Sequence, residues 1–485
     1  MKYDYKYKDL DFISEINSIA IIGASRKRNF FFTKTFHDTF KGQIYAINPG
    51  LKSIDELPSV EVYDKLTDVP SSKPIDYAFI TVPRHLVPDI ISDCVVKGVK
   101  MVGIFTADFA DEGTNEGKNL QMKILESADK QLRILGPNGM GLYYPKKGIR
   151  WRSSLPSDYG NVGVVAQSGG LCNLIIHGLT NENCPISKAF SIGNAIDVNV
   201  LDVFHYLLKD PETNIIVAYV EGLPKGIGKT LIDLIKSSQK PILILKAGRT
   251  KVGTQAAISH TASLVGNFTI WKSAIKQAGG ILLETYNDVI SLTKYIRMAG
   301  FKKIENACLV SLSGGYGVVC ADLLAEYGIK LPRFKVDSVT RNKLSNLFTA
   351  KGTSYNNPVD LAVTIYEPEK IGHIFEVILD DGLIDGIIFE IAPLYLTHQM
   401  RADINLSEEL YNTLKTVKSK CEKPIVVIIQ DIGYVDEQLA LKRKLQEINI
   451  PVYSDILPVT RLLKVLNKST LDSFLTIESP YNLHK

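Results

Sequence analysis

Short apolar runs alternate with amphipathic stretches along the whole chain, and the runs form three series. They are Ser18–Gly23, Gly42–Asn48, Tyr77–Val82 and Lys100–Phe105, then Val162–Ala166, Ile215–Val220 and Pro241–Lys246, then Ala307–Leu312, Gly386–Ile391 and Pro424–Ile429. Near-continuous apolar strands between helices are typical of parallel sheets covered on both faces. The pattern therefore predicts an α/β protein of three doubly wound units.

Two basic, glycine-containing stretches separate the three series. They are Tyr144–Arg152 and Arg297–Asn306. Stretches of this composition favour connections over buried elements. We therefore expect domains over residues 1–148, 153–300 and 304–470.

The second and third units share three features in the same order, which favours a duplicated fold. Each has a strand that leads into Ser-Gly-Gly, at Ser168 and at Ser313. Each then has Asn-x-x-Asp, over Asn194–Asp197 and Asn357–Asp360, and a later strand that ends near a glutamate. The two glutamates are Glu221 and Glu390.

The Ser-Gly-Gly junctions are candidate anion sites. Glycines let a backbone approach a ligand closely, and a helix N-terminus offers free N–H groups and positive potential. The six residues are Ser168, Gly169, Gly170, Ser313, Gly314 and Gly315. Two such junctions in related units suggest one phosphate held from two sides. The alternative is that the two serines only cap their helices.

In the first unit, candidate ligand contacts gather at strand ends, where parallel sheets bind ligands. Ile22–Ser25 has the position of a Rossmann phosphate turn but lacks Gly-x-Gly-x-x-Gly, and Asn48 stands where a nicotinamide enzyme carries an acidic residue. A phosphate-bearing nucleotide is thus favoured over an NAD-dependent oxidoreductase. The candidates are Gly23, Ala24, Ser25, Arg26, Asn48, Pro49, Val82, Pro83, Thr106 and Asn138. The alternative is that each Gly or Pro marks only a turn.

The stretch Lys246–Gly266 carries the strongest candidate for covalent chemistry. A strand ends at Lys246, a basic loop follows, and His260 stands between Ser259 and Thr261 before a helical pattern that begins at residue 262. Small and hydroxylated neighbours on a loop suit a neutral imidazole that must move and react. We therefore expect His260 on a loop, as a nitrogen nucleophile.

Composition and charge narrow the function classes. Of 485 residues, 45% are hydrophobic and 22% charged, as in ordinary globular proteins, and the net charge of +4 is too small to indicate nucleic acid or a membrane surface as partner. No apolar stretch reaches the ~20 residues that span a bilayer, and the N-terminus lacks the apolar core of a signal peptide. We expect a cytoplasmic protein with free cysteines and no metal site of its own.

Together these motifs resemble those of the NDP-forming acyl-CoA synthetases, relatives of succinyl-CoA synthetase, and above all the α subunit of ADP-forming acetate–CoA ligase. The resemblance covers nearly the whole chain. It rests on Ile22–Ser25, Asn48-Pro49, Gly136–Asn138, Gln167–Gly170, Gly193-Asn194, Tyr219–Glu221, Ser259–Thr261 and Asn357–Asp360, in this order.

The resemblance implies a Rossmann-like CoA-binding domain followed by two flavodoxin-like domains. It implies that His260 becomes phosphorylated and that Glu221 orients it. The reaction would be acyl-CoA + ADP + phosphate = carboxylic acid + CoA + ATP. ADP, ATP and Mg²⁺ would be held by the ATP-grasp domain of a separate β subunit in an α2β2 assembly, and we find no P-loop here.

The sequence departs from the family pattern at four places. Ala166 replaces a serine before Gln167, and Ala262 replaces glycine in the loop after His260. The turn Gly136–Asn138 is usually followed by cysteine and here by Gly139-Met140, and Asp108 replaces glycine before Phe109. The acid substrate, the choice between ADP and GDP and the direction in the cell stay open. The alternative from another class is a non-catalytic subunit that binds CoA or acyl-CoA as a sensor or scaffold.

Overall fold

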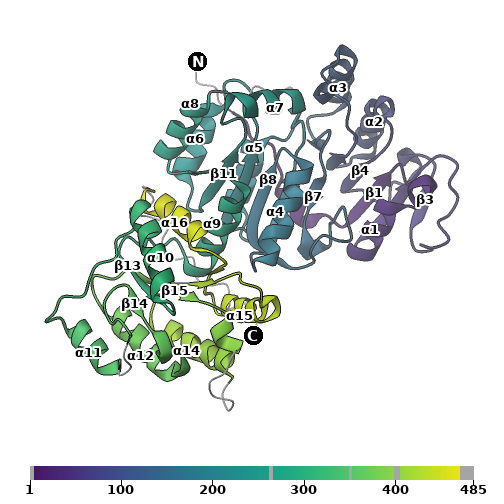
Figure 1. Ribbon diagram of the computed structural model, residues 1–485. Helices are drawn as coiled ribbons and strands as arrows, with labels where there is room; N and C mark the ends of the chain where they lie inside the picture. Colours follow the sequence, from purple (N-terminus) through teal and green to yellow (C-terminus); the bar gives the residue numbers. More distant parts are fainter. Residues whose placement is uncertain (1–4, 262–265, 349–351, 398–404, 470–485) are drawn as a thin grey trace. The chain divides into compact units, whose positions relative to one another are not determined.

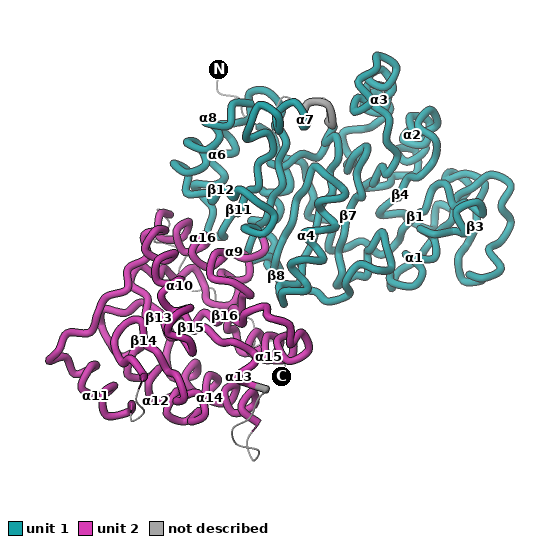
Figure 2. Tube along the Cα trace, viewed as in Figure 1, with its two compact units in different colours: residues 1–289 teal, residues 290–485 magenta. Residues whose placement is uncertain are grey.

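The computed structural model describes residues 5–261, 266–348, 352–397 and 405–469. The chain divides into two compact units, residues 1–289 and 290–485, which Figure 2 shows in teal and magenta. Unit 1 holds two sheets and unit 2 holds one (Figure 1).

The first sheet of unit 1 has the Rossmann strand order β3-β2-β1-β4-β5-β6, and all its pairs are parallel. Its strands are β1 (Ser18–Ile22), β2 (Gln43–Ile47), β3 (Glu61–Tyr63), β4 (Tyr77–Ile80), β5 (Met101–Ile104) and β6 (Arg133–Leu135), with helices α1 (Phe31–Thr39), α2 (Val87–Lys97) and α3 (Asn115–Ser127). The order reverses between β1 and β4. Ligands of such sheets bind at this reversal, outside the carboxyl ends of the strands.

The second sheet of unit 1 has the order β12-β11-β10-β8-β9-β7. Its strands are β7 (Gly141–Tyr143), β8 (Tyr159–Ala166), β9 (Ile186–Ser191), β10 (Ile215–Val220), β11 (Ile242–Lys246) and β12 (Ile281–Leu283). Its helices are α4 (Gly169–Asn181), α5 (Val200–Lys209), α6 (Gly228–Ser237), α7 (Lys251–Thr261) and α8 (Phe268–Gln277). β7 runs antiparallel to β9, an exception to the parallel pattern expected.

The sheet of unit 2 has the order β14-β13-β15-β16-β17. Its strands are β13 (Ala307–Ser311), β14 (Val359–Asp360), β15 (Gly386–Ile391), β16 (Ile425–Ile429) and β17 (Val452–Tyr453). The chain enters this unit within α9 (Tyr286–Ala299). The other helices of the unit are α10 (Gly314–Glu326), α11 (Val339–Leu347), α12 (Pro368–Leu379), α13 (Leu394–Thr397), α14 (Leu406–Lys420), α15 (Val435–Glu447) and α16 (Ile456–Asn467). The order matches β9-β8-β10-β11-β12, so the duplicated fold is confirmed.

Only one of the three repeated features lies at equivalent positions in the two sheets. The Ser-Gly-Gly junctions correspond, because β8 and β13 lead into α4 and α10. Tyr219 pairs with Ala166, two residues before Ser168. Phe389 pairs with Val310, so Glu390 stands opposite Ser311, two residues before Ser313. Glu390 therefore takes the place of Tyr219, and its equivalence to Glu221 is wrong.

The Asn-x-x-Asp motifs are not equivalent either. Asp360 pairs with Ser311 in the third sheet, and Ser191 pairs with Ala166 in the second. Asp360 thus corresponds to Ser191 and not to Asp197. Short motifs can recur by chance at positions that are not equivalent in two sheets, and the strand register shows which positions are equivalent.

All ten predicted apolar runs form strands, because their side chains are buried in the three sheets. The stretch expected as the first joint is packed rather than exposed: Tyr144, Ile149 and Trp151 are buried, and the Trp151 indole donates a hydrogen bond to Asn173. All six cysteines are free, as expected. Within the described ranges, no helix combines the length and the apolar character needed to cross a membrane.

Candidate functional site

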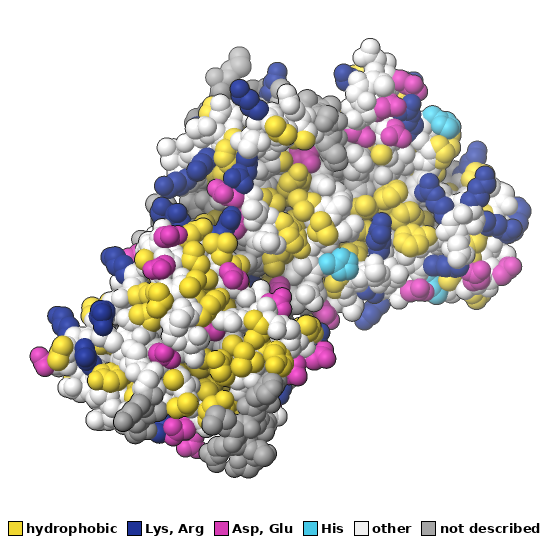
Figure 3. Space-filling model, in the orientation of Figure 1, with side chains coloured by type: hydrophobic (Ala, Val, Ile, Leu, Met, Phe, Trp, Pro, Cys, Tyr) yellow, Lys and Arg dark blue, Asp and Glu magenta, His cyan; other side chains and the backbone are white. Residues whose placement is uncertain are grey.

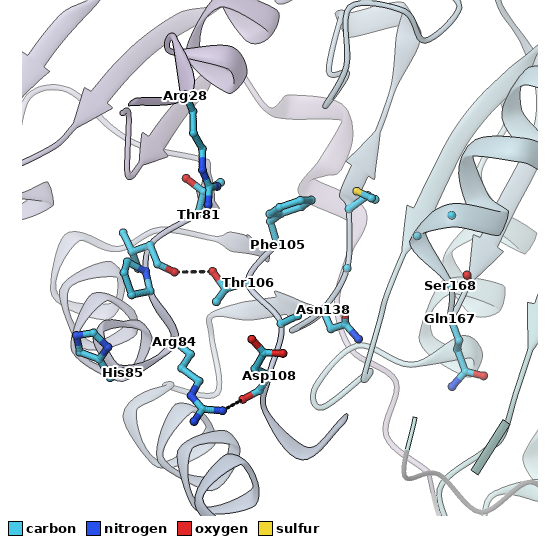
Figure 4. A pocket seen from close by; sticks show the side chains of 17 residues that line it. Arg28, Thr81, Arg84, His85, Phe105, Thr106, Asp108, Asn138, Gln167 and Ser168 are labelled. Carbon is cyan, nitrogen blue, oxygen red and sulfur yellow. Dashed lines mark hydrogen bonds between the residues drawn. The ribbon is translucent and has the colours of Figure 1, made fainter. Parts of the chain in front are cut away.

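Unit 1 has a cavity of about 660 Å³ whose lining comes from both of its sheets. The first sheet supplies Arg28 after β1 and the segments after β4, β5 and β6, and the second supplies the N-terminus of α4 (Figure 4). The lining residues are Arg28, Thr81, Val82, Pro83, Arg84, His85, Phe105, Thr106, Ala107, Asp108, Asn138, Gly139, Met140, Gln167, Ser168, Gly169 and Gly170. This volume is typical of small-molecule sites.

Four residues predicted to contact a nucleotide line the cavity: Val82, Pro83, Thr106 and Asn138. The Thr106 hydroxyl donates to the carbonyl of Val82 at 2.7 Å, which joins the ends of β4 and β5 (Figure 4). The other six, Gly23, Ala24, Ser25, Arg26, Asn48 and Pro49, lie at the neighbouring turns after β1 and β2 and are not among the lining residues.

The turn after β1 packs closely on the cavity wall. Gly23 has a φ of +97°, and a Cβ there would lie 2.8 Å from Thr81 Oγ1 and 3.2 Å from a Val82 methyl carbon. Glycine is therefore required both by the backbone conformation and by the close approach. Asn48 donates its side-chain amide to the carbonyl of Ala24 and so fixes the same turn.

Charged residues of the cavity were missed by the sequence analysis, although Arg84 and His85 directly follow Val82-Pro83. Arg84 donates to the carbonyl of Asp108 at 2.7 Å and to the carboxylate of Glu112 at 2.6 Å. Hydrogen bonds from Thr114 and Arg84 lower the pKa of Glu112, and the bond to Glu112 raises the pKa of Arg84. Arg28, the other arginine of the lining, is exposed, and an arginine at this edge favours an anionic ligand.

Three of the four departures from the family pattern have defined places. Ala166 is buried as the last residue of β8. Met140 lines the cavity, and its N–H donates to Ser191 Oγ at 2.9 Å. Asp108 lines it with a φ of +69°, a conformation that the glycine usual in the family adopts without strain. Ala262 lies outside the described residues.

The N-terminus of α4 opens into the cavity through Ser168, Gly169 and Gly170. Ser168 caps the helix, since its hydroxyl accepts a bond from the N–H of Leu171 at 3.3 Å. Capping and anion binding are compatible here, because the first N–H groups of a helix stay free for a ligand. A Cβ at Gly170 would meet no atom within 4 Å, so the approach is open.

Gln167 connects this helix start to Glu221. Its side-chain oxygen accepts from the N–H groups of Glu221 at 2.6 Å and of Gly222 at 3.1 Å. Glu221 is only 3% exposed. The amide of Gln167 therefore holds the turn after β10 against the cavity wall, and it fixes where the Glu221 side chain starts.

His260 lies in the last turn of α7, so the expected loop is wrong. The segment before it, from Lys251 to Ala257, contains alanines and long polar side chains that favour helix, and the Thr250 hydroxyl accepts from the N–H of Gly253 at 3.0 Å like an N-cap. The helix predicted from residue 262 corresponds to α8, which covers Phe268–Gln277, and residues 262–265 lie outside the described residues. The His260 side chain lies outside the description.

α7 contacts the 3-10 helix η5 (Ala110–Glu112), which follows the cavity residue Asp108. Asp111 of η5 also accepts a bond from the Asn194 side chain at 2.7 Å. The helix that carries His260 therefore borders the rim of the cavity.

The second Ser-Gly-Gly junction has a different electrostatic setting. Ser313 makes no side-chain cap bond, and a Cβ at Gly314 would lie 2.6 Å from an Asp360 carboxylate oxygen. Fully buried Glu390 accepts from Ser311 at 2.6 Å, and burial raises its pKa. Ser313, Gly314 and Gly315 thus lie beside a carboxylate of their own unit, where the α4 junction has neutral Ser191 and Tyr219.

Two families match parts of the chain. A family described as a CoA binding domain matches residues 17–145, and one described as a succinyl-CoA ligase like flavodoxin domain matches residues 159–296. The first covers the sheet with the Rossmann order and the second covers the sheet that follows it. Fold and site thus define a CoA-binding Rossmann-like domain followed by succinyl-CoA ligase-like flavodoxin domains.

Similarity over nearly the whole of this chain narrows the class to one family. The chain is 30% identical to the ADP-forming acetate–CoA ligase II of Archaeoglobus fulgidus, over 96% of this chain and 68% of that protein. It is 29% identical to the α subunit of the ADP-forming acetate–CoA ligase II of Pyrococcus furiosus, over 92% of this chain and 94% of that one. The chain belongs to the NDP-forming acyl-CoA synthetase family and is like the α subunit of ADP-forming acetate–CoA ligase.

A solved structure agrees with this assignment. The dinucleotide-forming acetyl-coenzyme A synthetase 1 of Candidatus Korarchaeum cryptofilum, in complex with phosphate and ADP, superimposes with a TM-score of 0.80 at 27% identity, over 95% of this chain and 96% of that chain. In the part of our chain that the structure describes, no group of three or more His, Cys, Asp or Glu residues could hold a metal ion.

Proposed function

We propose that this chain is the CoA-binding, phosphohistidine-bearing subunit of an ADP-forming acyl-CoA synthetase. One observation carries the proposal: a single cavity joins the strand ends of the CoA-binding domain to the N-terminus of α4. From there Gln167 leads to Glu221, and the helix of His260 borders the same rim. The thioester, the phosphate and the relay nitrogen would thus meet at one place.

The reaction divides into two transfers at this site. A phosphate oxygen attacks the thioester carbonyl, the C–S bond breaks, and CoA leaves as a thiolate that takes a proton. A ring nitrogen of His260 then attacks the phosphorus of the acyl phosphate, the bond from phosphorus to the acyl oxygen breaks, and the carboxylate leaves. The N-terminus of α4 offers N–H donors to the phosphoryl oxygens throughout.

Glu221 is proposed to orient the imidazole. A carboxylate bonded to one ring nitrogen leaves the lone pair of the other free and stabilises the positive charge that develops. Its main chain is held by Gln167, so little reorganisation is needed.

The nucleotide and Mg²⁺ are proposed to arrive on an ATP-grasp β subunit, in an α2β2 assembly. Two relatives of Pyrococcus furiosus are named as α subunits, which supports a partner chain. Unit 2 exposes apolar side chains on α10, α15 and α16, namely Val318, Val319, Val435 and Leu457, and Figure 3 shows apolar side chains gathered over α10 and α15. Apolar patches of this kind favour an interface.

We place this protein in the cytoplasm and its three domains at 1–148, 153–300 and 304–470.

The test is phosphorylation of the chain without ADP. The chain is incubated with labelled inorganic phosphate and each of a panel of acyl-CoA thioesters: acetyl, branched, aryl and hydroxyacyl. We expect acid-labile, base-stable label with at least one thioester, because a phosphoramidate has this stability and a phosphoserine does not. Binding of CoA with no label from any thioester would favour the sensor or scaffold function instead.

Ser168→Ala is expected to slow labelling by about ten- to a hundredfold, because one donor to the phosphoryl group is lost at ~1–3 kcal/mol. Ser313→Ala is expected to have a smaller effect, since the Asp360 carboxylate already lies at that helix start. Initial labelling rates measure both, with thermal unfolding to correct for the lost cap of α4. Equal losses would support a phosphate held from two sides.

Glu221→Gln is expected to slow labelling by between about a hundredfold and ten-thousandfold. The amide oxygen still accepts the ring N–H but cannot stabilise an imidazolium-like charge, so some activity remains. The rate is compared with wild type at saturating acyl-CoA. An unchanged rate would show that Glu221 does not contact the histidine.

A further inference from the structure

One buried lysine lies directly behind the Glu221 turn. Lys246, the last residue of β11, is 2% exposed, and its ammonium donates to the carbonyl of Glu221 at 2.7 Å and to the carbonyl of Ala247 at 2.6 Å. The same ammonium lies 5.2 Å from the ring centroid of Trp271 on α8. These contacts involve two main-chain carbonyls and an aromatic face.

Two of the three contacts belong to segments that flank His260 in the chain. Ala247 opens the stretch that leads into α7, and Trp271 belongs to the helix that follows the histidine motif. Trp271 also packs on Gly266, where a Cβ would lie 3.0 Å from the indole nitrogen. Lys246 therefore contacts both ends of the segment that carries His260, together with the turn that carries Glu221.

A charged group is costly at this position. An apolar side chain of similar length would fill the space without losing the hydration of an ammonium. The ammonium is thus expected to serve the carbonyls and the nearby carboxylate of Glu221, whose charge favours the protonated lysine. The side-chain oxygen of Gln167 accepts from the N–H groups of Glu221 and Gly222 in the same turn.

We propose that Lys246 is a positioning residue that ties the Glu221 turn to both ends of the His260 segment, so that the two side chains meet in register for phosphoryl transfer. The proposal rests on the function proposed above. It extends that function to a residue outside the cavity lining, which acts through other residues and touches no substrate.

The test compares Lys246→Met and Lys246→Arg with Lys240→Met. Lys240 precedes the same strand at its other end, and its ammonium also donates to two carbonyls, of Leu207 at 2.9 Å and of Asp210 at 2.7 Å. We expect Lys246→Met to slow labelling by at least about a hundredfold with CoA affinity within about twofold, and Lys246→Arg to restore part of the rate. Lys240→Met is expected to label like wild type.

Hydrogen exchange separates this proposal from the proposed function, because it needs no activity. In Lys246→Met, amides of residues 247–257 and 266–271 should exchange at least about tenfold faster, whereas in Lys240→Met they should not. If the wild-type chain is not phosphorylated, the proposed function is wrong, and hydrogen exchange alone tests whether Lys246 holds the Glu221 turn and the two ends of the His260 segment together. Normal labelling in Lys246→Met, unchanged exchange, or equal losses in both methionine variants would overturn the proposal.

The pH dependence gives a further check. Burial lowers the pKa of Lys246 to about 8, and Glu221 is the charged group, among the described residues, that acts on it. The ammonium of Lys246 makes its contacts below this pKa and loses its charge above it, so the rate of wild-type labelling should fall above about pH 8. The free energy of unfolding should change in the opposite direction. Between about pH 8 and ~10.4 the unfolded chain still binds this proton while the folded chain has lost it. The stability of the wild type relative to Lys246→Met should therefore rise with pH over this range. Lys246→Arg should lack the decline.

Discussion

Replacing His260 with alanine is expected to abolish the acid-labile label that forms from acyl-CoA and labelled phosphate. The methyl group has no nitrogen to accept the phosphoryl group, so the loss is complete rather than partial. CoA affinity should stay within about twofold of wild type, because the contacts that we assign to CoA belong to the first sheet of unit 1. The measurement is a labelled-phosphate gel with calorimetry of CoA binding.

Two further histidines serve as comparisons for this variant. His85 lines the cavity, whereas His373 lies on α12 and has a side chain that is 67% exposed. His373→Ala should label like wild type. Loss of the label in His85→Ala, with the label retained in His260→Ala, would show that His85 and not His260 accepts the phosphoryl group. Acid-stable label would instead indicate a hydroxyl, such as Ser259 or Thr261.

Gly23→Val is expected to weaken CoA binding more than about tenfold, or ~1.4 kcal/mol. The new Cβ would lie 2.8 Å from Thr81 Oγ1 and 3.2 Å from the Thr81 carbonyl carbon, at a φ of +97° that a β-branched residue rarely adopts. The turn after β1 must then move away from the end of β4, where Val82 and Pro83 line the cavity. Calorimetry with CoA measures the loss.

The matched control for this variant is Gly98→Val. Gly98 follows α2 with a φ of +70°, but a Cβ there meets no atom within 4 Å. Gly98→Val therefore also places a β-branched residue at a positive φ, but without the clash at the cavity. We expect similar losses of thermal stability from the backbone and a loss of CoA affinity only in Gly23→Val. Equal CoA affinity in the two variants would place the ligand away from this turn.

The amino-acid sequence alone determined ten of the strands and the class of fold, whereas β3, β6, β7, β9, β12, β14 and β17 were not among the predicted runs. The apolar runs of the three sheets are buried on both faces, so their pattern is continuous and visible without coordinates. Val82, Pro83, Thr106 and Asn138 were also predictable, because residues after parallel strands meet at one edge of a sheet. The order of the motifs along the chain was sufficient to identify the family.

Tertiary structure decided which of these segments meet. The cavity joins the ends of β4 and β5 to Ser168 of the second sheet, a contact that no periodicity encodes. Strand register separated Glu221 from Glu390. The helical position of His260 follows instead from local residues, with Thr250 as an N-cap, and the sequence analysis missed it. Lys246 ended an ordinary apolar run in the sequence. Its role follows from three contacts that depend on long-range packing, which local residue patterns do not record.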